Sequence, residues 1–409
     1  MHRILLLMAT RTYRARAFLR AARRLGAEVV VGSERPQAVA KPGATLALDF
    51  RDPAHATAQI VAEARERPFD AIVGVDDDTV LIAAMAAAAL GIPHNAVEAV
   101  RATRNKYLMR RLLADAGVPS PWFTLVRLDE DLTAAARRLH YPCVVKPTFL
   151  SASRGVIRAD DEVDFVRAAE RVRAILAEPE VAAMGGDEAG HVLVEEYIPG
   201  AETALEGILT AGELQVLALF DKPDPLEGPY FEETIYVTPA RLSPAHERAL
   251  IETTAAAARA LGLREGPVHA EVRLNAQGAW VVEIAARSIG GLCSTVLEFS
   301  GGRSLEELIL LHAVGAEISH TEHQRRPSGV MMIPIPRAGV LGAVRGLDAA
   351  RAVPGITAIT LTIPLGDRVM PPPEGDRYLG FIFARGGSPD AVEAALREAY
   401  SRLELVITE

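Results

Sequence analysis

The 409-residue sequence predicts a protein of mixed α/β and α+β class with two or three domains. Up to about residue 104, short apolar runs alternate with stretches of helical periodicity, the pattern of βαβ units with a parallel sheet. From there to about residue 320, paired strands and long helices indicate a mixed sheet. The remaining residues form short strands punctuated by Pro and Gly, with one helix, which predicts a small α+β domain.

Composition and charge exclude several classes of protein. Hydrophobic residues make up 49% and charged residues 24%, near the globular average, so a fibre or a disordered chain is excluded. The net charge of −9 argues against nucleic acid as a partner, because binding a phosphate backbone normally needs a basic surface. Cys143 and Cys293 are far apart and predict neither a disulfide framework nor a thiolate zinc site.

A membrane segment is not expected. The longest nearly apolar run, residues 80–90, is about half of the roughly 20 residues that a membrane-spanning helix needs. The apolar run at the N-terminus is followed by arginines and lacks a small-residue cleavage site, so it predicts a first β-strand and not a signal peptide. We therefore expect a cytoplasmic protein.

The first 104 residues are predicted to form the parallel sheet. Strands are expected at residues 4–8, 29–31 and 71–75, and helices at residues 17–25 and 56–64. Such βαβ connections imply that helices cover the sheet.

Two loops of this region bear on function. The loop at residues 9–13 has no glycine, so the dinucleotide-binding fingerprint GxGxxG is missing and NAD is not expected there. Asp76, Asp77 and Asp78 follow a strand at its carboxyl end, where open α/β sheets place ligands. Two interpretations stay open for them: a solvated turn in which Asp78 or Thr79 caps the next helix, or a role in ligand binding.

The next segment contains a candidate phosphate-binding loop. A helix at residues 105–117 ends at a glycine followed by prolines, and a buried strand is expected at residues 143–147. Residues 148–155, TFLSASRG, are small and polar, a composition that suits a loop folding over phosphates. A helix is predicted at residues 162–176 and a mobile segment at residues 178–189.

Further elements complete the prediction. Strands are expected at residues 203–209, 214–220, 268–274 and 279–285, with helices at residues 244–261 and 389–403.

The lysines are few. Only four of the 44 basic residues are lysines, namely Lys41, Lys106, Lys146 and Lys222. A retained lysine therefore indicates a site that needs a compact ammonium group and does not accept the planar fork of a guanidinium. For Lys106, at the start of a helix, and Lys146, at the end of a buried strand, this outweighs the default interpretation of a solvated charge.

Two glutamates form the strongest local signal. Glu271 and Glu283 lie on two adjacent predicted strands separated by the turn NAQG, among apolar neighbours. Facing carboxylates repel unless a cation lies between them, and Mg²⁺ binds through one or two carboxylates together with nucleotide phosphates. The pair therefore predicts a Mg²⁺ site, in which Mn²⁺ could substitute.

Five segments in this order resemble the ATP-grasp superfamily. They are RNKYLMRRLLADAGVPSP, VVKPTFLSASRGV, VEEYIPGAE, HAEVRLN and VVEIAARSIGG. In addition, LFDKPDPLEGPYFEETIYVTP and GVMMIPIPRAGVL resemble the branch that contains the L-amino acid ligases, which make dipeptides. The resemblance implies an ATP-grasp fold with a Rossmann-like pre-ATP-grasp domain (residues 1–104), an ATP-grasp domain (105–320) with a lid at about 144–194, and a small C-terminal α+β domain (321–409).

The resemblance also implies an ATP site. Lys106 and Lys146 match the lysines that bind nucleotide phosphates, and Glu202 matches the carboxylate that takes the ribose hydroxyls. The loop that closes over the phosphates matches Ser151, Ser153, Arg154 and Gly155. The hinge, whose backbone hydrogen-bonds adenine, matches Glu195, Glu196, Tyr197 and Ile198. A disordered surface loop and, for Glu196, a side chain that simply faces solvent stay open as alternatives.

For catalysis, the resemblance points to three residues. Glu271 and Glu283 match the metal ligands, and Arg287 matches the arginine that steadies the acyl phosphate and the tetrahedral intermediate. The asparagine usual two residues past the second glutamate is replaced by Ala285. One of the two metal sites is therefore expected to rely more on water or to bind more weakly.

Four further residues are candidates for substrate binding. His269 either orients substrate or pairs with a carboxylate, and Lys222 lies either near the active site or in a surface turn. Gly290 and Gly291 would let the backbone approach the substrate closely.

The implied enzyme is an acid–amino acid ligase that forms a C–N bond. ATP phosphorylates a carboxylate, ADP leaves, and an amine attacks the acyl phosphate to give an amide. The resemblance implies amino acids as both substrates, and many enzymes of this architecture resemble homodimers.

Three alternatives are kept. A biotin-carboxylase-like enzyme is disfavoured because residues 230–234 lack basic groups and because Gly290 and Gly291 stand where that family has a glutamate base. A purine-pathway ATP-grasp enzyme is the second. The third, a nucleotide-binding regulator with a degraded metal site, is motivated by Ala285.

Overall fold

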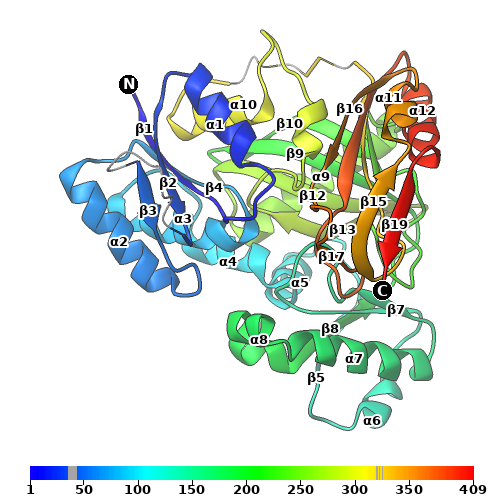
Figure 1. The fold of residues 1–409 in the computed structure, drawn as a ribbon. Coiled ribbons are helices and arrows are strands. Elements are labelled where there is room, and N and C mark those ends of the chain that lie inside the picture. The colour runs from blue at the N-terminus through cyan, green and yellow to red at the C-terminus, as the bar shows by residue number, and fades with distance from the viewer. Residues whose placement is uncertain (36–43, 319–320, 322, 325) are drawn as a thin grey trace.

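The computed structural model describes residues 1–35, 44–318, 321, 323–324 and 326–409. Lys41 and the predicted boundary at residue 320 lie outside this part of the chain. The described residues form four sheets, and Figure 1 shows the smallest lobe, around α7 and β8, below the main body.

The N-terminal sheet is parallel, with the strand order β3-β2-β1-β4. Its elements are β1 (Arg3–Leu7), α1 (Ala15–Arg24), β2 (Glu28–Ser33), β3 (Thr45–Ala47), α2 (Pro53–Glu66), β4 (Ala71–Gly74) and α3 (Asp77–Leu90). The predicted βαβ pattern is confirmed. Strand β3 was not predicted, because three residues are too few to show the hydrophobic pattern of a strand. The first strand is buried along its whole length, as expected for a sheet covered on both faces.

Helices α4 (Val97–Arg104) and α5 (Lys106–Asp115) lead into a small antiparallel sheet with the order β5-β8-β6-β7. Its elements are β5 (Phe123–Arg127), α6 (Leu132–Ala136), β6 (Cys143–Lys146), β7 (Ile157–Ala159), α7 (Glu162–Leu176), α8 (Pro179–Gly185), a 3₁₀ turn (Gly186–Gly190) and β8 (His191–Glu196). The helix predicted at residues 162–176 is confirmed. In the segment predicted to be mobile, residues 178–189, Pro179 starts helix α8 and Val181 packs into the core of the small sheet.

An eight-stranded antiparallel sheet forms the centre, with the order β13-β12-β9-β10-β11-β14-β18-β16. Its strands are β9 (Ala201–Thr210), β10 (Glu213–Asp221), β11 (Ile235–Thr238), β12 (Gly266–Asn275), β13 (Gly278–Ala285), β14 (Ser328–Met332), β16 (Ile356–Leu361) and β18 (Gly380–Arg385). Helices α9 (Pro244–Leu261), α10 (Leu305–Ala313) and α12 (Pro389–Ser401) pack against it, and a short 3₁₀ turn lies at Cys293–Val296. The sheet thus includes strands from both sides of residue 320, and the domain boundaries stay predictions.

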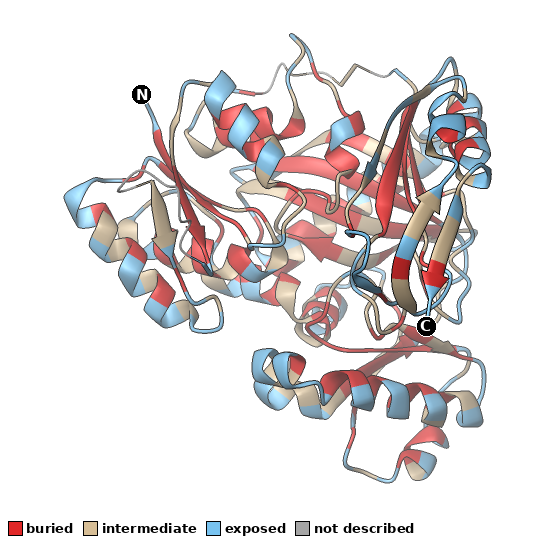
Figure 2. Cartoon of the chain, viewed as in Figure 1, coloured by how far each residue is buried: buried red, intermediate tan, exposed pale blue. Residues whose placement is uncertain are grey.

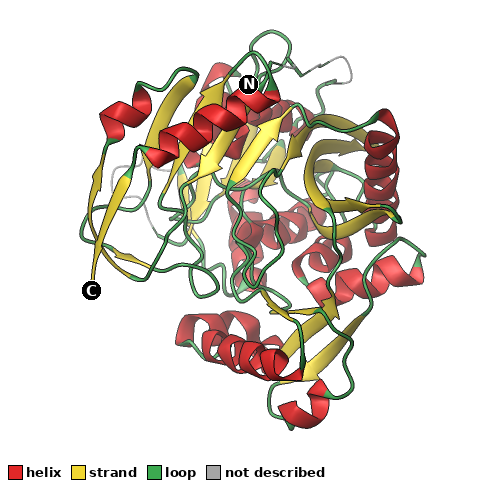
Figure 3. Cartoon of the chain, turned by 90° about the vertical axis from the view of Figure 1, so that its right-hand side faces the viewer, coloured by secondary structure: helices red, strands yellow, loops and turns green. Residues whose placement is uncertain are grey.

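A three-stranded sheet near the C-terminus has the order β17-β15-β19, from β15 (Gly339–Arg345), β17 (Arg368–Val369) and β19 (Glu404–Thr408), next to α11 (Leu347–Arg351). Figure 3, from the side, shows the small sheet of β5 to β8 as a layer of its own below the central sheet.

The hydrophobic cores explain this layout. Phe18 of α1 and Leu6 of β1 share one core with Phe220 and Phe381 of the central sheet, so the N-terminal domain is packed firmly onto that sheet. The small sheet has a separate core around Phe165. Figure 2 shows the buried strands inside each layer and the exposed faces of the helices outside. A lobe with its own core can move as a unit.

Candidate active site

The two predicted phosphate-binding lysines meet in one cavity. Lys106 is the first residue of α5, and its Nζ donates to the Leu150 carbonyl at 2.7 Å. Lys146 is the last residue of β6 and pairs with the Glu195 carboxylate. Both lysines are buried, so their charges act at low effective dielectric. A buried ammonium group is costly unless it is paired, and carboxylates supply the pairing.

This first cavity has a volume of about 760 Å³, including its open mouth. Most of the residues predicted to bind nucleotide line it: Lys106, Lys146, Ser151, Ser153, Glu195, Glu196, Tyr197, Ile198 and Glu202. Arg154 and Gly155 do not. The Arg154 guanidinium lies 2.6 Å from Glu178 and 3.8 Å from Asp376, and the Gly155 N–H donates to the Pro373 carbonyl at 2.8 Å.

The loop between β6 and β7 has an unusual backbone. Ala152 and Ser153 both have φ of +54°, a region that non-glycine residues seldom adopt. Gly155 follows with φ of +73°, and a Cβ there would lie 2.8 Å from the Pro147 side chain. The loop is therefore held in one tight conformation over the cavity.

The hinge offers a free backbone donor. The Glu196 N–H donates to the Trp122 carbonyl at 2.8 Å, and the Tyr197 N–H to the Pro142 carbonyl at 3.1 Å. Within the described residues, the Ile198 N–H has no protein acceptor. This half-buried N–H lines the cavity and is available to a ligand.

Glu271 and Glu283 lie directly opposite each other on β12 and β13. Each has a lysine partner: Glu271 lies 3.0 Å from the Lys222 Nζ, and Glu283 lies 3.3 Å from the Lys106 Nζ. Burial alone would raise the pKa of Glu271, but Lys222 and His269 outweigh it and lower the pKa to about 2. Burial likewise opposes ionisation of Glu283, and Lys106 lowers its pKa. Two ionised, half-buried carboxylates side by side are a donor set that fits Mg²⁺.

Lys222 is not in a surface turn. Its buried ammonium group lies among three carboxylates, 2.7 Å from Glu202 and 2.6 Å from Glu233 in addition to Glu271. The Glu202 carboxylate also accepts from Arg273 at 3.0 Å. These three carboxylates, which line the first cavity, offset the charge of the Lys222 ammonium group and hold it in place.

A second cavity of about 1,310 Å³ opens on the other side of the glutamates. It shares Ser151, Ser153, Glu233, Glu271 and Glu283 with the first cavity, so the two meet at the predicted metal ligands. Further residues singled out from the sequence line it, namely His269, Ala285, Arg287, Gly290 and Gly291, whereas Lys222 is in the lining of neither cavity.

His269 pairs with two carboxylates. Its Nδ1 contacts Glu206 and its Nε2 lies 3.4 Å from Glu271. Burial would lower the pKa of His269, but the two carboxylates raise it to about 9, so the imidazole is a cation at neutral pH. Glu206 is fully buried and also accepts from the Ile289 N–H at 3.0 Å. Of the two interpretations for His269, the structure shows carboxylate pairing, in the wall of the second cavity.

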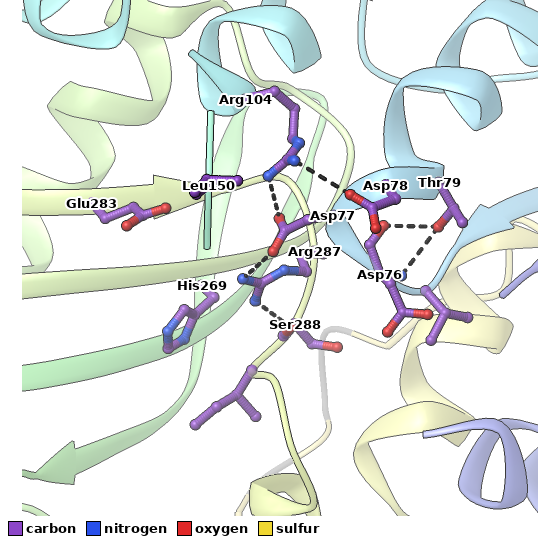
Figure 4. Close-up of polar contacts among 12 residues, drawn as sticks. Asp76, Asp77, Asp78, Thr79, Arg104, Leu150, His269, Glu283, Arg287 and Ser288 are labelled. Carbon is purple, nitrogen blue, oxygen red and sulfur yellow. Dashed lines mark hydrogen bonds and ion pairs between the residues drawn. The ribbon is translucent and has the colours of Figure 1, made fainter. Parts of the chain in front are cut away.

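Arg287 lies at the cavity wall with an acidic partner from the N-terminal domain. Its Nη2 lies 2.8 Å from Asp77 Oδ2, and Arg104 lies 3.3 Å from the other oxygen of Asp77 (Figure 4). Burial opposes both charges, yet Asp77 raises the pKa of Arg287, and the two guanidinium groups lower the pKa of Asp77.

The three aspartates after β4 do not share one role, so the two interpretations left open by the sequence apply to different residues. Asp76 is the N-cap residue of helix α3, and neither Asp78 nor Thr79 is: the Thr79 hydroxyl accepts from the Asp76 N–H at 3.1 Å and donates to the Asp76 carbonyl at 2.7 Å. Asp77 reaches the site, and all three aspartates line the second cavity.

Sequence reasoning missed three site residues, Asp77 in this role, Glu206 and Arg110. Arg110 is fully buried on α5 and donates to Glu195 at 2.8 Å and to the Val282 carbonyl at 2.6 Å. The sequence signal that could have identified Arg110 is a basic residue on the apolar face of a predicted helix. Because arginines are abundant in this chain, that signal did not stand out.

No helix in the described part of the chain has the length and apolarity of a membrane span.

Comparison with known families identifies the class. Models of an ATP-grasp N-terminal domain, an ATP-grasp domain and the L-amino acid ligase C-terminal domain 2 match residues 19–94, 139–296 and 331–408. The chain therefore has the domains of an ATP-grasp protein, as the sequence motifs predicted. Its C-terminal domain matches the one described for the L-amino acid ligases.

Individual relatives agree. The alanine–anticapsin ligase of Bacillus subtilis is 31% identical over 244 residues, which cover 57% of this chain and 51% of that protein. The chain thus spans about half the length of this curated relative. The crystal structure of an L-amino acid ligase from Bacillus licheniformis matches with a TM-score of 0.86 at 27% identity, covering 100% of this chain and 99% of that one.

The fold itself is shared more widely. N5-carboxyaminoimidazole ribonucleotide synthetase from Thermotoga maritima matches with a TM-score of 0.71 at 18% identity, covering 100% of both chains. At that identity the similarity shows the fold alone.

Proposed function

We propose that this protein is an ATP-dependent carboxylate–amine ligase that forms an amide, dipeptide-like bond through an acyl phosphate and releases ADP and phosphate. One observation carries the proposal: the first cavity, lined by the two lysines and the hinge, and the charged second cavity meet at Glu271 and Glu283. A phosphoryl group can pass from one side to the other only at such a junction.

On the nucleotide side, the assignments follow the contacts. The free Ile198 N–H would donate a hydrogen bond to the adenine ring. Glu202, next to the hinge, would accept hydrogen bonds from the ribose hydroxyls. Lys106 and Lys146 would neutralise the phosphates, since their ammonium groups lie in the same cavity. Ser151 and Ser153, which line both cavities, would close over the transferring group, whereas Arg154 and Gly155 would hold the loop from outside.

Glu271 and Glu283 would hold Mg²⁺, which when bound offsets the negative charge of the transferring phosphoryl group. Ala285 places a methyl group and not an amide oxygen beside them. We therefore keep the expectation that one of two ions is bound less firmly.

On the substrate side, Arg287 would stabilise the negative charge that develops on the reacting carboxylate and phosphoryl oxygens. His269, as a cation, would hold Glu206 and Glu271 in place beside it. In the reaction, the carboxylate oxygen bonds to the terminal phosphorus while ADP leaves, and the amine nitrogen then bonds to the acyl carbon while phosphate leaves. The small sheet would exclude water from the acyl phosphate.

Both substrates are proposed to be amino acids, a cytoplasmic location is expected, and a homodimer stays a prediction. The biotin-carboxylase-like and purine-pathway alternatives share the fold. Against the regulator, Lys106, Lys146, Glu271, Glu283 and Arg287 are all gathered around two connected cavities.

The test is ADP release with Mg-ATP against a panel of amino acids, singly and in pairs, with hydroxylamine as a surrogate amine. We expect hydroxamate from one carboxylate, and faster ADP release when a second amino acid is present. ADP release that is indifferent to any amino acid, or that requires bicarbonate, would contradict the proposal.

A further inference from the structure

The N-terminal domain contacts the segment that carries Arg287 at two consecutive residues. Asp77, at the start of α3, lies 2.8 Å from the Arg287 Nη2 although 210 positions separate them. Arg14, buried just before α1, donates to the Val75 carbonyl at 2.6 Å, to the Ser288 carbonyl at 3.3 Å and to the Ser288 hydroxyl. The segment that follows β13 is thus fastened to the loop that follows β4.

Both oxygens of the Asp77 carboxylate are already paired with arginines. Its Oδ2 accepts from Arg287, and its Oδ1 faces Arg104 at 3.3 Å, with the two guanidinium groups on either side of the carboxylate in Figure 4. The Asp77 and Arg287 side chains are 15% and 14% exposed, so solvent screens this pair little.

Arg287, in contrast, keeps donors free. One N–H of Nη2 serves Asp77, and one of Nη1 serves the Ser288 carbonyl at 3.0 Å. A guanidinium group has five N–H donors in a fixed plane. Fixing two of them determines the direction of the plane, and three remain for oxygens in the second cavity, which Arg287 lines.

The position of Asp77 is itself fixed. It is the first residue of a 14-residue helix whose N-cap residue, Asp76, is held by the Thr79 hydroxyl and, through its carboxylate, by the Thr12 hydroxyl at 2.7 Å. The unpaired N–H groups at this helix end favour a negative charge there.

We propose that Asp77 is the positioning residue for Arg287, through which the N-terminal domain aims the arginine at the reacting carboxylate and phosphoryl oxygens. This inference rests on the proposed function. It gives the N-terminal domain a part in catalysis without any contact to nucleotide, since Asp77 does not line the first cavity.

The first test is Asp77→Asn, which keeps the size of the side chain and removes its charge. We expect kcat for carboxylate-dependent ADP release to fall about 10- to 100-fold, because a misplaced catalytic group costs that order, with the KM for ATP unchanged. Asp49→Asn is the matched control, since it breaks an exposed Asp–Arg pair of the same domain, with Arg51. If Asp77→Asn does not fold, Asp77→Ser removes the same charge. An unchanged kcat would overturn the proposal.

A double-mutant cycle separates positioning from general damage to the fold. In an Arg287→Ala background, Asp77→Asn should cause no further loss of kcat, because the two residues act as one unit. An equal loss in both backgrounds would overturn the proposal and assign Asp77 a structural role.

A third readout does not depend on activity. Phenylglyoxal modifies arginine in its deprotonated form, and the negative charge of Asp77 disfavours that form of Arg287. Asp77→Asn should therefore raise the rate at which Arg287 is modified several-fold, measured by peptide mass spectrometry. Asp49→Asn should leave that rate unchanged. Equal rates would overturn the proposal. A wild-type protein without carboxylate-dependent ADP release would refute the proposed function, and the modification rate would still decide whether Asp77 holds Arg287.

Discussion

Glu283 has the most demanding role of any single residue in this account. It faces Glu271 across two strands, and each carboxylate is balanced by a lysine, Lys106 and Lys222 respectively. The positive charges that the facing glutamates require are thus supplied partly by the protein, which keeps both carboxylates ionised before a metal ion or nucleotide binds.

Replacing Glu283 by Gln should abolish ADP formation, with a loss of at least about 100-fold, while leaving the fold intact. The amide keeps the size but loses the charge that binds Mg²⁺ and pairs with Lys106. Steady-state ADP release and circular dichroism measure the two effects. Glu252→Gln, on the exposed face of α9, is the control. Wild-type turnover by Glu283→Gln would show that the metal assignment is wrong.

Glu195 provides a pH-dependent part of the stability. Burial would raise its pKa, but Arg110 and Lys146 lower it to about 2. Because the folded-state value lies below the unfolded value of 4.5, this stabilisation is complete above pH 4.5 and is lost as pH falls toward 2.

We therefore expect Glu195→Gln to lower the free energy of unfolding by about 3 kcal/mol at pH 7, and by progressively less below pH 4.5. Urea unfolding of both proteins between pH 7 and pH 3, without nucleotide, measures the difference. A difference that does not change with pH would contradict the ion-pair explanation.

How far the sequence predicted the site differs from residue to residue. Lys106 and Lys146 could be found because lysine is rare in this chain and each marks the end of an element. Asp77 and Glu206 could not, because their partners Arg287 and His269 lie 210 and 63 positions away, and only the folded sheets bring them together.

Among the elements, the loop between β6 and β7 carries backbone strain. Ala152 and Ser153 adopt left-handed conformations, which cost about 1 kcal/mol or more each. Strain of this kind persists only where the surroundings enforce it, and Gly155, packed on Pro147, is the anchor. Its composition predicted the loop, whereas its conformation depends on contacts from distant segments.

Gly155→Ala should raise the KM for ATP about tenfold, because a cost of about 1.4 kcal/mol on the closed loop is a factor of ten in binding. The added Cβ meets Pro147 and the backbone is left-handed. Gly26→Ala is the control: its φ is +65°, but nothing lies within 4 Å of the added atom. Both variants should lose stability, and only Gly155→Ala should change KM. Equal KM values would contradict the role of the loop.

At the scale of the whole molecule, one C-terminal segment connects the predicted lid to the substrate cavity. The Pro373 carbonyl accepts from Gly155, and Glu374 accepts from Arg171 of α7 at 2.9 Å. A few residues later, the Tyr378 hydroxyl donates to Glu233 at 3.1 Å. We therefore predict that closure of the lid and the shape of the second cavity are coupled through residues 371–378.

Glu374→Ala should weaken the closed position of the lid and raise the KM for ATP about two- to fivefold, since partly exposed ion pairs contribute up to about 1 kcal/mol. Glu404→Ala breaks an exposed pair with Arg345 in the same part of the chain and should leave KM unchanged. Initial rates over a range of ATP concentrations measure both. The same KM for both variants would argue against the coupling.

The general architecture could be predicted from the sequence because the hydrophobic pattern changes along the chain, from alternating strands and helices to paired strands. The continuity of the central sheet did not follow. Strands β14, β16 and β18 join β11 across residue 320, and the order β11-β14-β18-β16 depends on antiparallel pairings between segments about 90 and 50 residues apart. Local patterns do not encode such pairings.

The central claim is that a carboxylate is activated as an acyl phosphate. The most direct measurement uses ¹⁸O-labelled carboxylate in the amino acid that gives the fastest ADP release, with phosphate analysed by mass spectrometry. Because the carboxylate oxygen stays with phosphorus when the amine displaces phosphate, we predict one ¹⁸O atom in each phosphate released. Amide formation with unlabelled phosphate would contradict the account.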